Sequence, residues 1–197
     1  MPGDTQKDAG SRDRAAHEAR RGKKQPTLAD LSRTLPDEEE VSKLFELMEN
    51  ESDRGCALVA GSFVEAAVEM AVAARMVDDK KVIDEVFYRS DSPAGSFSAK
   101  IKLAQGLGMF GPQTAEKLRR IKDVRNAFAH ALRPLDFSHP TIVRACEQLD
   151  PRRPMVAHPP KLSAARVRYI AMCRALFFHI YRKAQEEGGK IVKYDLP

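Results

Sequence analysis

The sequence predicts an all-α protein, a single helical bundle of about six or seven helices that follows a charged N-terminal tail. Apolar residues recur three and four positions apart in several long segments, which is the spacing of one face of an α-helix. No segment alternates apolar and polar residues as a half-buried strand does, and no internal repeat is evident. The 197 residues suffice for one well-buried domain with tails.

Composition divides the chain into a tail, a helical domain and a short C-terminal tail, at residues 1–35, 36–190 and 191–197. Residues 1–35 are polar and poor in aromatic side chains, so we expect them to be disordered, because they cannot bury enough apolar surface. Of the formal charge of +5, +3 falls in residues 1–26, which hold seven Lys or Arg and four Asp or Glu. The domain is therefore nearly neutral, which argues against a strong electrostatic footprint for duplex DNA.

Hydropathy and cysteine content predict a cytoplasmic protein without a cofactor or metal ion. The sequence shows no apolar run of 18 residues, so we expect no contact with a membrane. The N-terminus lacks the apolar core of a signal peptide. Cys56, Cys146 and Cys173 are scattered, with no CxxC motif and no histidine pair at ligand spacing. These features predict three reduced and buried thiols.

Two helices are expected at the start of the domain. The run Pro36–Glu40 predicts a helix start, because acidic side chains favour the positive end of the helix dipole, and an apolar stripe continues to Met48. A second helix is expected from Ser52 to Val77. Alanine and glycine dominate this segment and allow close helix contacts, so we expect it near the centre of the bundle.

Three further helices are expected between residues 80 and 132. A short helix over 80–88 is followed by a turn-rich loop, and Ser96 or Ser98 is the expected N-cap of a helix over 99–107. A long helix is expected from residue 112 or 113 to about Leu132, and Pro134 ends it. Its apolar stripe consists of Leu118, Ile121, Val124, Phe128 and Leu132.

The remaining helices flank a proline-rich segment. A short helix is expected to open at His139-Pro140 and to continue to Leu149. Residues 150–160 are expected to form an irregular crossing. The last helix is expected over 163–187, ended by Gly188 and Gly189.

The most informative polar motif is Arg125–His130, with the sequence RNAFAH, late in the long helix. Arginine holds phosphate and histidine moves a proton near neutral pH, so the pair suits phosphate chemistry. On a helix Arg125 lies about 140° from His130, so the two flank the apolar stripe, and a two-fold axis would bring each motif to its copy. In the alternative, Arg125 pairs with an acid such as Glu65 or Asp53, and His130 lies at the negative end of the helix dipole.

Four short blocks occur in a fixed order along the chain: Asp53-Arg54, Gly61–Glu65, Gly95–Lys102 and Arg125–His130. Together they resemble the mannitol operon repressor family over roughly residues 40–150. The resemblance implies an all-helical protein with a role in transcription regulation and without a recognisable DNA-binding motif.

The spacing of Arg125 and His130 also resembles the arginine–histidine signature of HEPN domains. These domains are helical bundles, and many of them are dimeric, metal-independent ribonucleases. The resemblance implies that Arg125 holds the scissile phosphate and that His130 acts as acid or base. Asn126 would be the polar residue that often follows the arginine.

Two further groups are candidate contacts for phosphate or nucleic acid. The first lies in and after the loop before helix 99–107, whose free N–H groups can bind an anion: Ser96, Ser98, Lys100 and Lys102. The alternative is a tight capped turn that packs Phe97 into the core. The second group gives the long helix a basic side: Arg119, Arg120 and Lys122. The alternative is a solvated helix face.

These patterns favour a regulatory protein that acts through protein contacts or weak nucleic-acid binding rather than catalysis. A HEPN-like, toxin-like endoribonuclease that uses Arg125 and His130 across a dimer is the alternative. A structural interaction module is a second alternative. We expect a homodimer with a protein partner or a contact with RNA or DNA.

Overall fold

A computed structural model of the chain describes residues 25, 27–28, 31, 36–149 and 162–187. The chain divides into two units, Met1–Pro36 and Asp37–Pro197. The second unit holds every helix discussed below. The predicted N-terminal tail apart from residues 25, 27–28 and 31, the predicted crossing at 150–160, the glycine cap at 188–189 and the predicted C-terminal tail lie outside the described residues.

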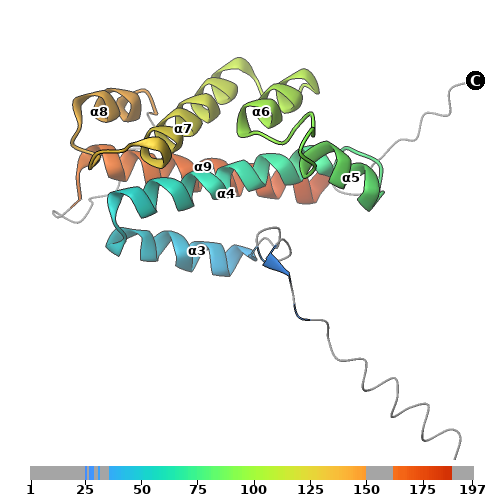
Figure 1. The fold of residues 1–197 in the computed structure, drawn as a ribbon, viewed down its shortest axis with the longest axis horizontal. Coiled ribbons are helices and arrows are strands. Elements are labelled where there is room, and N and C mark those ends of the chain that lie inside the picture. The colour runs from blue at the N-terminus through green and yellow to red at the C-terminus, as the bar shows by residue number, and fades with distance from the viewer. Residues whose placement is uncertain (1–24, 26, 29–30, 32–35, 150–161, 188–197) are drawn as a thin grey trace, which may run out of the picture. The chain divides into compact units, whose positions relative to one another are not determined.

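The described part of the chain contains seven α-helices, one 3-10 turn and no strand (Figure 1). This confirms the predicted all-α fold. The elements in chain order are α3 (Glu38–Leu47), η1 (Met48–Asn50), α4 (Asp53–Ala73), α5 (Lys80–Phe87), α6 (Phe97–Gly106), α7 (Pro112–His130), α8 (Pro140–Glu147) and α9 (Ala164–Glu187).

Two long helices from distant parts of the sequence, α4 and α9, lie side by side through the middle of the domain (Figure 1). They run parallel, because Arg166 near the start of α9 contacts Asp53 at the start of α4, while Ala71 and Ala184 near their ends line the same pocket. Helices α6 and α7 pack against α4, and α8 packs against α9 and α7.

The composition of α4 explains its central place. Its buried face carries small side chains, among them Ala57, Ala60, Gly61 and Ala67, so neighbouring helices approach closely. The helix ends at Ala73, four residues before the predicted end at Val77. The composition of residues 74–77 still favours a helix, so the sequence pattern does not mark this end.

The composition of α4 bears on the expectation that no segment of the chain spans a membrane. Among the described residues α4 is a helix long and apolar enough to cross a membrane by length and composition, with a mean hydropathy of 1.7 over an 18-residue window. Half of that window is buried inside the bundle. A central core helix passes the same test, because both environments select apolar side chains.

Helix ends follow ordinary capping chemistry. Asp37 and Glu40 form a capping box at the start of α3, in which each side chain accepts a hydrogen bond from the backbone N–H of the other residue. Ser96 is the N-cap of α6 and accepts from the N–H of Ala99 at 3.1 Å, so the helix begins two residues before the predicted start at Ala99.

The long helix α7 ends at His130, two residues before the predicted end at Leu132. The side chain of Arg54 donates a hydrogen bond to the carbonyl of Ala131, where the chain has left the helix. The predicted apolar stripe is buried at Leu118, Ile121, Val124 and Phe128. Leu132 was wrongly assigned to it, because the side chain of Leu132 is fully exposed.

Aromatic side chains and thiols fill the core between the helices. Phe137, in the loop after α7, packs between Phe128 and Tyr169, with ring centroids 4.8 and 5.5 Å away. The three cysteines are free and buried, as predicted. Burial raises the pKa of Cys56 to about 11 and that of Cys146 to about 12.

Candidate functional site

The guanidinium of Arg125 is engaged inside its own subunit. It forms an ion pair with Glu65 of α4, one of the two acids expected as a partner. It also donates to the side-chain oxygen of Asn126 at 3.1 Å and lies 5.9 Å from the centroid of the Phe97 ring. The Arg125 side chain is 23% exposed. The arginine of the motif is therefore a partly buried link between α7, α4 and α6.

Lys100 of α6 extends this link into a network. Its ammonium group lies 2.9 Å from Glu65 and 2.7 Å from Glu69, and its side chain is only 8% exposed. Burial by itself lowers the pKa of Lys100, but the hydrogen bonds and negative charges of Glu69 and Glu65 outweigh burial and raise it. Glu69 also accepts a hydrogen bond from the hydroxyl of Tyr88.

The network joins two carboxylates to two cations, so its formal charge is zero. We call these four residues, Glu65, Glu69, Lys100 and Arg125, the α4–α7 charge network. Because the network is neutral and carboxylates hold both cations, its electrostatic attraction for a phosphate group is weak. Its chemistry is that of a polar clamp between three helices.

Gly61 makes the close approach of these helices possible. A Cβ atom built on Gly61 would lie 2.9 Å from Cβ and Cγ of Arg125 and 2.9 Å from the hydroxyl of Tyr169. These contacts are shorter than the van der Waals separation, and the first two involve the inner part of the Arg125 side chain. Glycine at position 61 therefore lets α7 and α9 contact α4 at the level of the charge network.

His130 lies apart from the network. It is the last residue of α7, and its side chain is exposed. Within the described ranges no hydrogen bond or ion pair joins the side chain of His130 to another residue. One subunit therefore does not bring the arginine and the histidine of the motif together.

The candidate phosphate-binding residues of α6 occupy different environments. The hydroxyl of Ser96 caps the helix, Lys100 is buried in the charge network, and Lys102 is exposed. Ser98 is half-buried. Phe97 is buried, as expected if this segment is a capped turn that anchors the helix.

The basic side of α7 is paired with nearby side chains. Arg119 donates to Gln105 at 2.6 Å, and Arg120 lies 3.2 Å from Glu116. Lys122 lies 2.8 Å from its neighbour Asp123. The structure keeps these three cations on one helix but surrounds them with acidic and amide groups.

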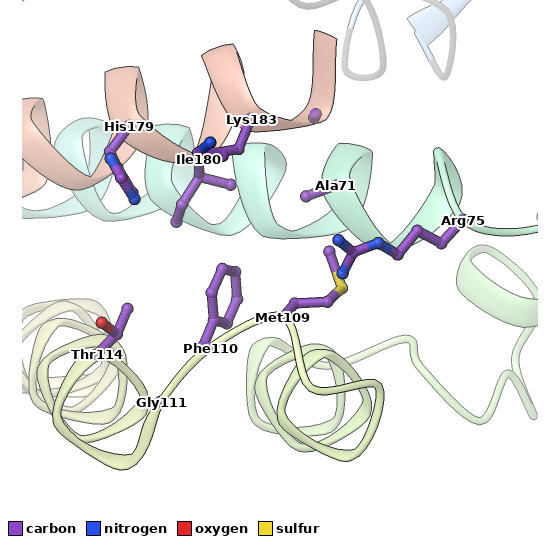
Figure 2. Close-up of a pocket in the computed structure, with 10 residues that line it drawn as sticks. Ala71, Arg75, Met109, Phe110, Gly111, Thr114, His179, Ile180 and Lys183 are labelled. Atoms are coloured by element: carbon purple, nitrogen blue, oxygen red, sulfur yellow. The ribbon is translucent and has the colours of Figure 1, made fainter. Parts of the chain in front are cut away.

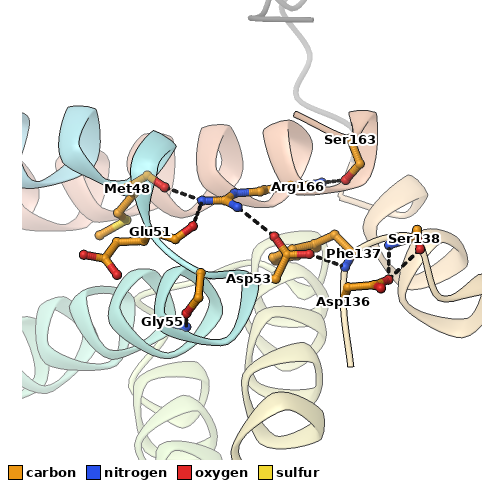
Figure 3. Close-up of polar contacts among 10 residues, drawn as sticks. Met48, Glu51, Asp53, Gly55, Asp136, Phe137, Ser138, Ser163 and Arg166 are labelled. Carbon is orange, nitrogen blue, oxygen red and sulfur yellow. Dashed lines mark hydrogen bonds and ion pairs between the residues drawn. The ribbon is translucent and has the colours of Figure 1, made fainter. Parts of the chain in front are cut away.

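A second polar cluster, centred on Arg166, was missed by the sequence analysis (Figure 3). The guanidinium donates to the carboxylate of Asp53 at 2.7 Å, to the carbonyl of Met48 at 2.6 Å and to the carbonyl of Glu51 at 2.7 Å. The other oxygen of Asp53 accepts from the N–H of Phe137 at 2.8 Å. The cluster joins α9, η1, α4 and the loop after α7.

No signal in the sequence marked Arg166. The arginine lies on a helix with several other basic residues, most of which are exposed, and two of its acceptors are backbone carbonyls. Of the residues in this cluster, Asp53 belongs to one of the four sequence blocks, but it was expected to pair with Arg125.

The fold is shared with a solved structure. The chain is similar to a chain in the X-ray structure of the MtlR–HPr complex from Escherichia coli, with a TM-score of 0.54 and 19% sequence identity. The match covers 71% of this chain and 97% of that chain. No protein-family model matches the sequence, and no curated protein matches it. At this level of identity the match shows that the two chains share a fold of the MtlR type.

Proposed function

We propose that this chain is a regulatory protein that acts by binding a partner protein, and that the partner is of the HPr kind. The observation that carries the proposal is the shared fold, which spans nearly the whole matched chain of a complex with HPr. The same likeness supports a role like that of the mannitol operon repressor family, in which binding rather than catalysis is the activity.

The contacts of the RNAFAH motif support binding over catalysis. Arg125 is engaged by Glu65 and Asn126, and His130 lies exposed at the end of α7. A ribonuclease would need the arginine free for a phosphate and the histidine within reach of the same reacting group. In the described chain the charge network occupies the arginine instead.

The test is a calorimetric titration of the full-length chain with the HPr protein of the same organism. We expect saturable binding at micromolar concentrations, typical of transient regulatory contacts. An unrelated protein of similar size and charge serves as the control and should give no heat of binding. Absence of binding at concentrations far above micromolar would overturn the assignment of the partner.

A parallel assay separates the ribonuclease alternative. The wild-type chain and the variants Arg125→Ala and His130→Ala are incubated with varied RNAs without metal ions, and sedimentation gives their oligomeric state. We expect no cleavage by any of the three. Cleavage by the wild type that is lost in both folded variants would replace the regulatory proposal with a HEPN-like nuclease.

A further inference from the structure

A pocket of about 300 Å³ lies between α4, α9 and the connection from α6 to α7, beside Phe110 (Figure 2). Arg75 and His179 lie at opposite ends of this pocket, so the basic groups on its wall do not converge on one ligand. A more defined arrangement lies where the chain leaves α7. We call this stretch, residues 131–137, the 131–137 segment.

Two consecutive residues at the start of α4 hold both ends of the 131–137 segment. The side chain of Arg54 donates a hydrogen bond to the carbonyl of Ala131 at its beginning. The carboxylate of Asp53 accepts a hydrogen bond from the N–H of Phe137 at its end, at 2.8 Å (Figure 3). The ring of Phe137 is buried in the core. The segment is therefore fixed against the first turn of α4.

The side chain of Leu132, the second residue of the segment, is 102% exposed. Leu47, the next most exposed large apolar side chain among the described residues of the helical unit, is 60% exposed. A single exposed leucine is common on protein surfaces. A leucine on a fixed segment is better suited to contact a partner, because little conformational freedom is lost when it binds.

Basic side chains lie next to Leu132. Arg133 follows it in the chain, His130 precedes it by two positions, and Arg54 reaches the carbonyl of Ala131. All three basic side chains are exposed. In the part of the chain that the structure describes, no carboxylate forms an ion pair with either arginine.

The acids beside the segment are engaged by other groups. Asp136, the one acid within it, accepts hydrogen bonds from the N–H and the hydroxyl of Ser138 at 2.8 and 2.5 Å. Asp53 accepts from the guanidinium of Arg166 at 2.7 Å, in addition to the N–H of Phe137. The exposed leucine therefore lies beside two arginines that remain able to pair with external carboxylates.

We propose that the 131–137 segment is a docking point for an acidic segment of a partner protein. Leu132 packs between apolar side chains of that segment, and Arg54 and Arg133 pair with its carboxylates, which suit the fork of a guanidinium group. A protein fits better than a nucleic acid, because a phosphate backbone offers a leucine no apolar surface and is usually bound by more cations. The proposal concerns a surface of this chain and stands apart from the HPr-kind partner.

The test uses an acidic peptide, Asp-Glu-Leu-Phe-Glu-Asp-Leu-Glu, as the probe and the full-length chain labelled with ¹⁵N. We expect saturable shifts of the amide signals of Ala131, Leu132 and Arg133, with a Kd of about 1 mM or lower. One control peptide has Asn and Gln in place of the acids, and another has Ser in place of Leu and Phe. Each control should bind at least tenfold more weakly.

Two variants with matched controls test the two kinds of contact. Leu132→Ser and Arg133→Gln should each weaken binding of the acidic peptide about tenfold, because one removes the apolar contact and the other a charged donor. Leu107→Ser and Lys102→Gln make comparable changes at exposed positions at the end of α6 and within it. Both should leave the affinity unchanged. Circular dichroism checks that all four variants are folded.

Three results would overturn the proposal. One is no saturable shift with the acidic peptide. Another is the same loss of affinity in Leu107→Ser as in Leu132→Ser. The third is binding of single-stranded oligouridine that is lost in Arg133→Gln but kept in Leu132→Ser, which would assign the surface to nucleic acid. Calorimetry with HPr decides the identity of the partner separately from these results.

Discussion

Lys100 is the most deeply buried charged group of the α4–α7 charge network. In the folded protein the carboxylates of Glu65 and Glu69 surround its ammonium group in place of water. Removal of one partner from a buried charge cluster leaves the other charges uncompensated. The resulting loss of stability is larger than the loss caused by breaking an exposed ion pair. Arg125 and Tyr88 continue to contact the two carboxylates when Lys100 is absent.

Replacement of Lys100 by methionine is therefore expected to lower the free energy of unfolding by about 3 kcal/mol. Urea denaturation of the wild type, Lys100→Met and Lys102→Met measures this. Lys102 is exposed on the same helix, so Lys102→Met should change stability by less than about 0.5 kcal/mol. Equal effects in both variants would show that the charge network does not stabilise the bundle.

The pH dependence of the same experiment has a defined sign. The pKa of Lys100 is raised in the folded protein above its ordinary value of 10.5. The folded state then binds the proton more tightly, so the stabilisation is complete below pH 10.5 and is lost as the pH rises through the folded pKa. The wild type should lose more stability than Lys100→Met over this alkaline range.

At the scale of secondary-structure elements, Arg166 holds four segments in register. Its donors reach the carbonyls that end the α3–η1 segment, and its partner Asp53 also holds the N–H of Phe137. These polar contacts join segments that are distant in sequence, so neither helix propensity nor apolar spacing predicts them. They join the start of α9 to the start of α4.

Arg166→Met should destabilise the protein by about 3–5 kcal/mol, because it removes the charged donor to the carboxylate of Asp53 and to the carbonyls of Met48 and Glu51. Arg174→Met is the control on an exposed position of the same helix and should cost less than about 0.5 kcal/mol. Thermal unfolding followed by circular dichroism compares the two. Arg166→Lys should recover only part of the loss, since lysine cannot reach several acceptors in a fixed fork.

At the scale of the whole molecule, the three buried thiols report on global unfolding. Cys56, Cys146 and Cys173 come from α4, α8 and α9, and burial raises the pKa of each thiol. Thiolate is the reactive form, and it is scarce at pH 8 when the pKa is about 11 or higher. None of the three is exposed in the folded bundle.

We expect the native protein to react with a thiol reagent such as DTNB at pH 8 only at the rate at which the bundle opens. In urea above the unfolding midpoint all three thiols should react rapidly. The rate at which the coloured product of DTNB forms gives the reactivity of the thiols in the native and in the unfolded protein. Rapid reaction of one thiol in the native protein would show that the helix that carries it opens locally.

The sequence predicted the helices well and the polar contacts in part. Apolar spacing placed each described helix, with ends wrong by two residues at α6, α7 and α8 and by four at α4. Glu65 was one of the two acids expected as a partner of Arg125, and the structure pairs them. Lys100 was a candidate phosphate contact, and the structure buries it as a counter-ion to two glutamates.

The sequence alone determined the helical class and the apolar faces, because both follow from side-chain periodicity within a segment. It also determined that α4 is central, since small side chains allow close packing on several sides. Only the tertiary structure decided which charges meet. Glu65, Lys100 and Arg125 are separated by tens of residues, as are Asp53 and Arg166, and their pairing depends on how the helices pack. The pocket beside Phe110 likewise exists only where two parallel helices and a loop come together.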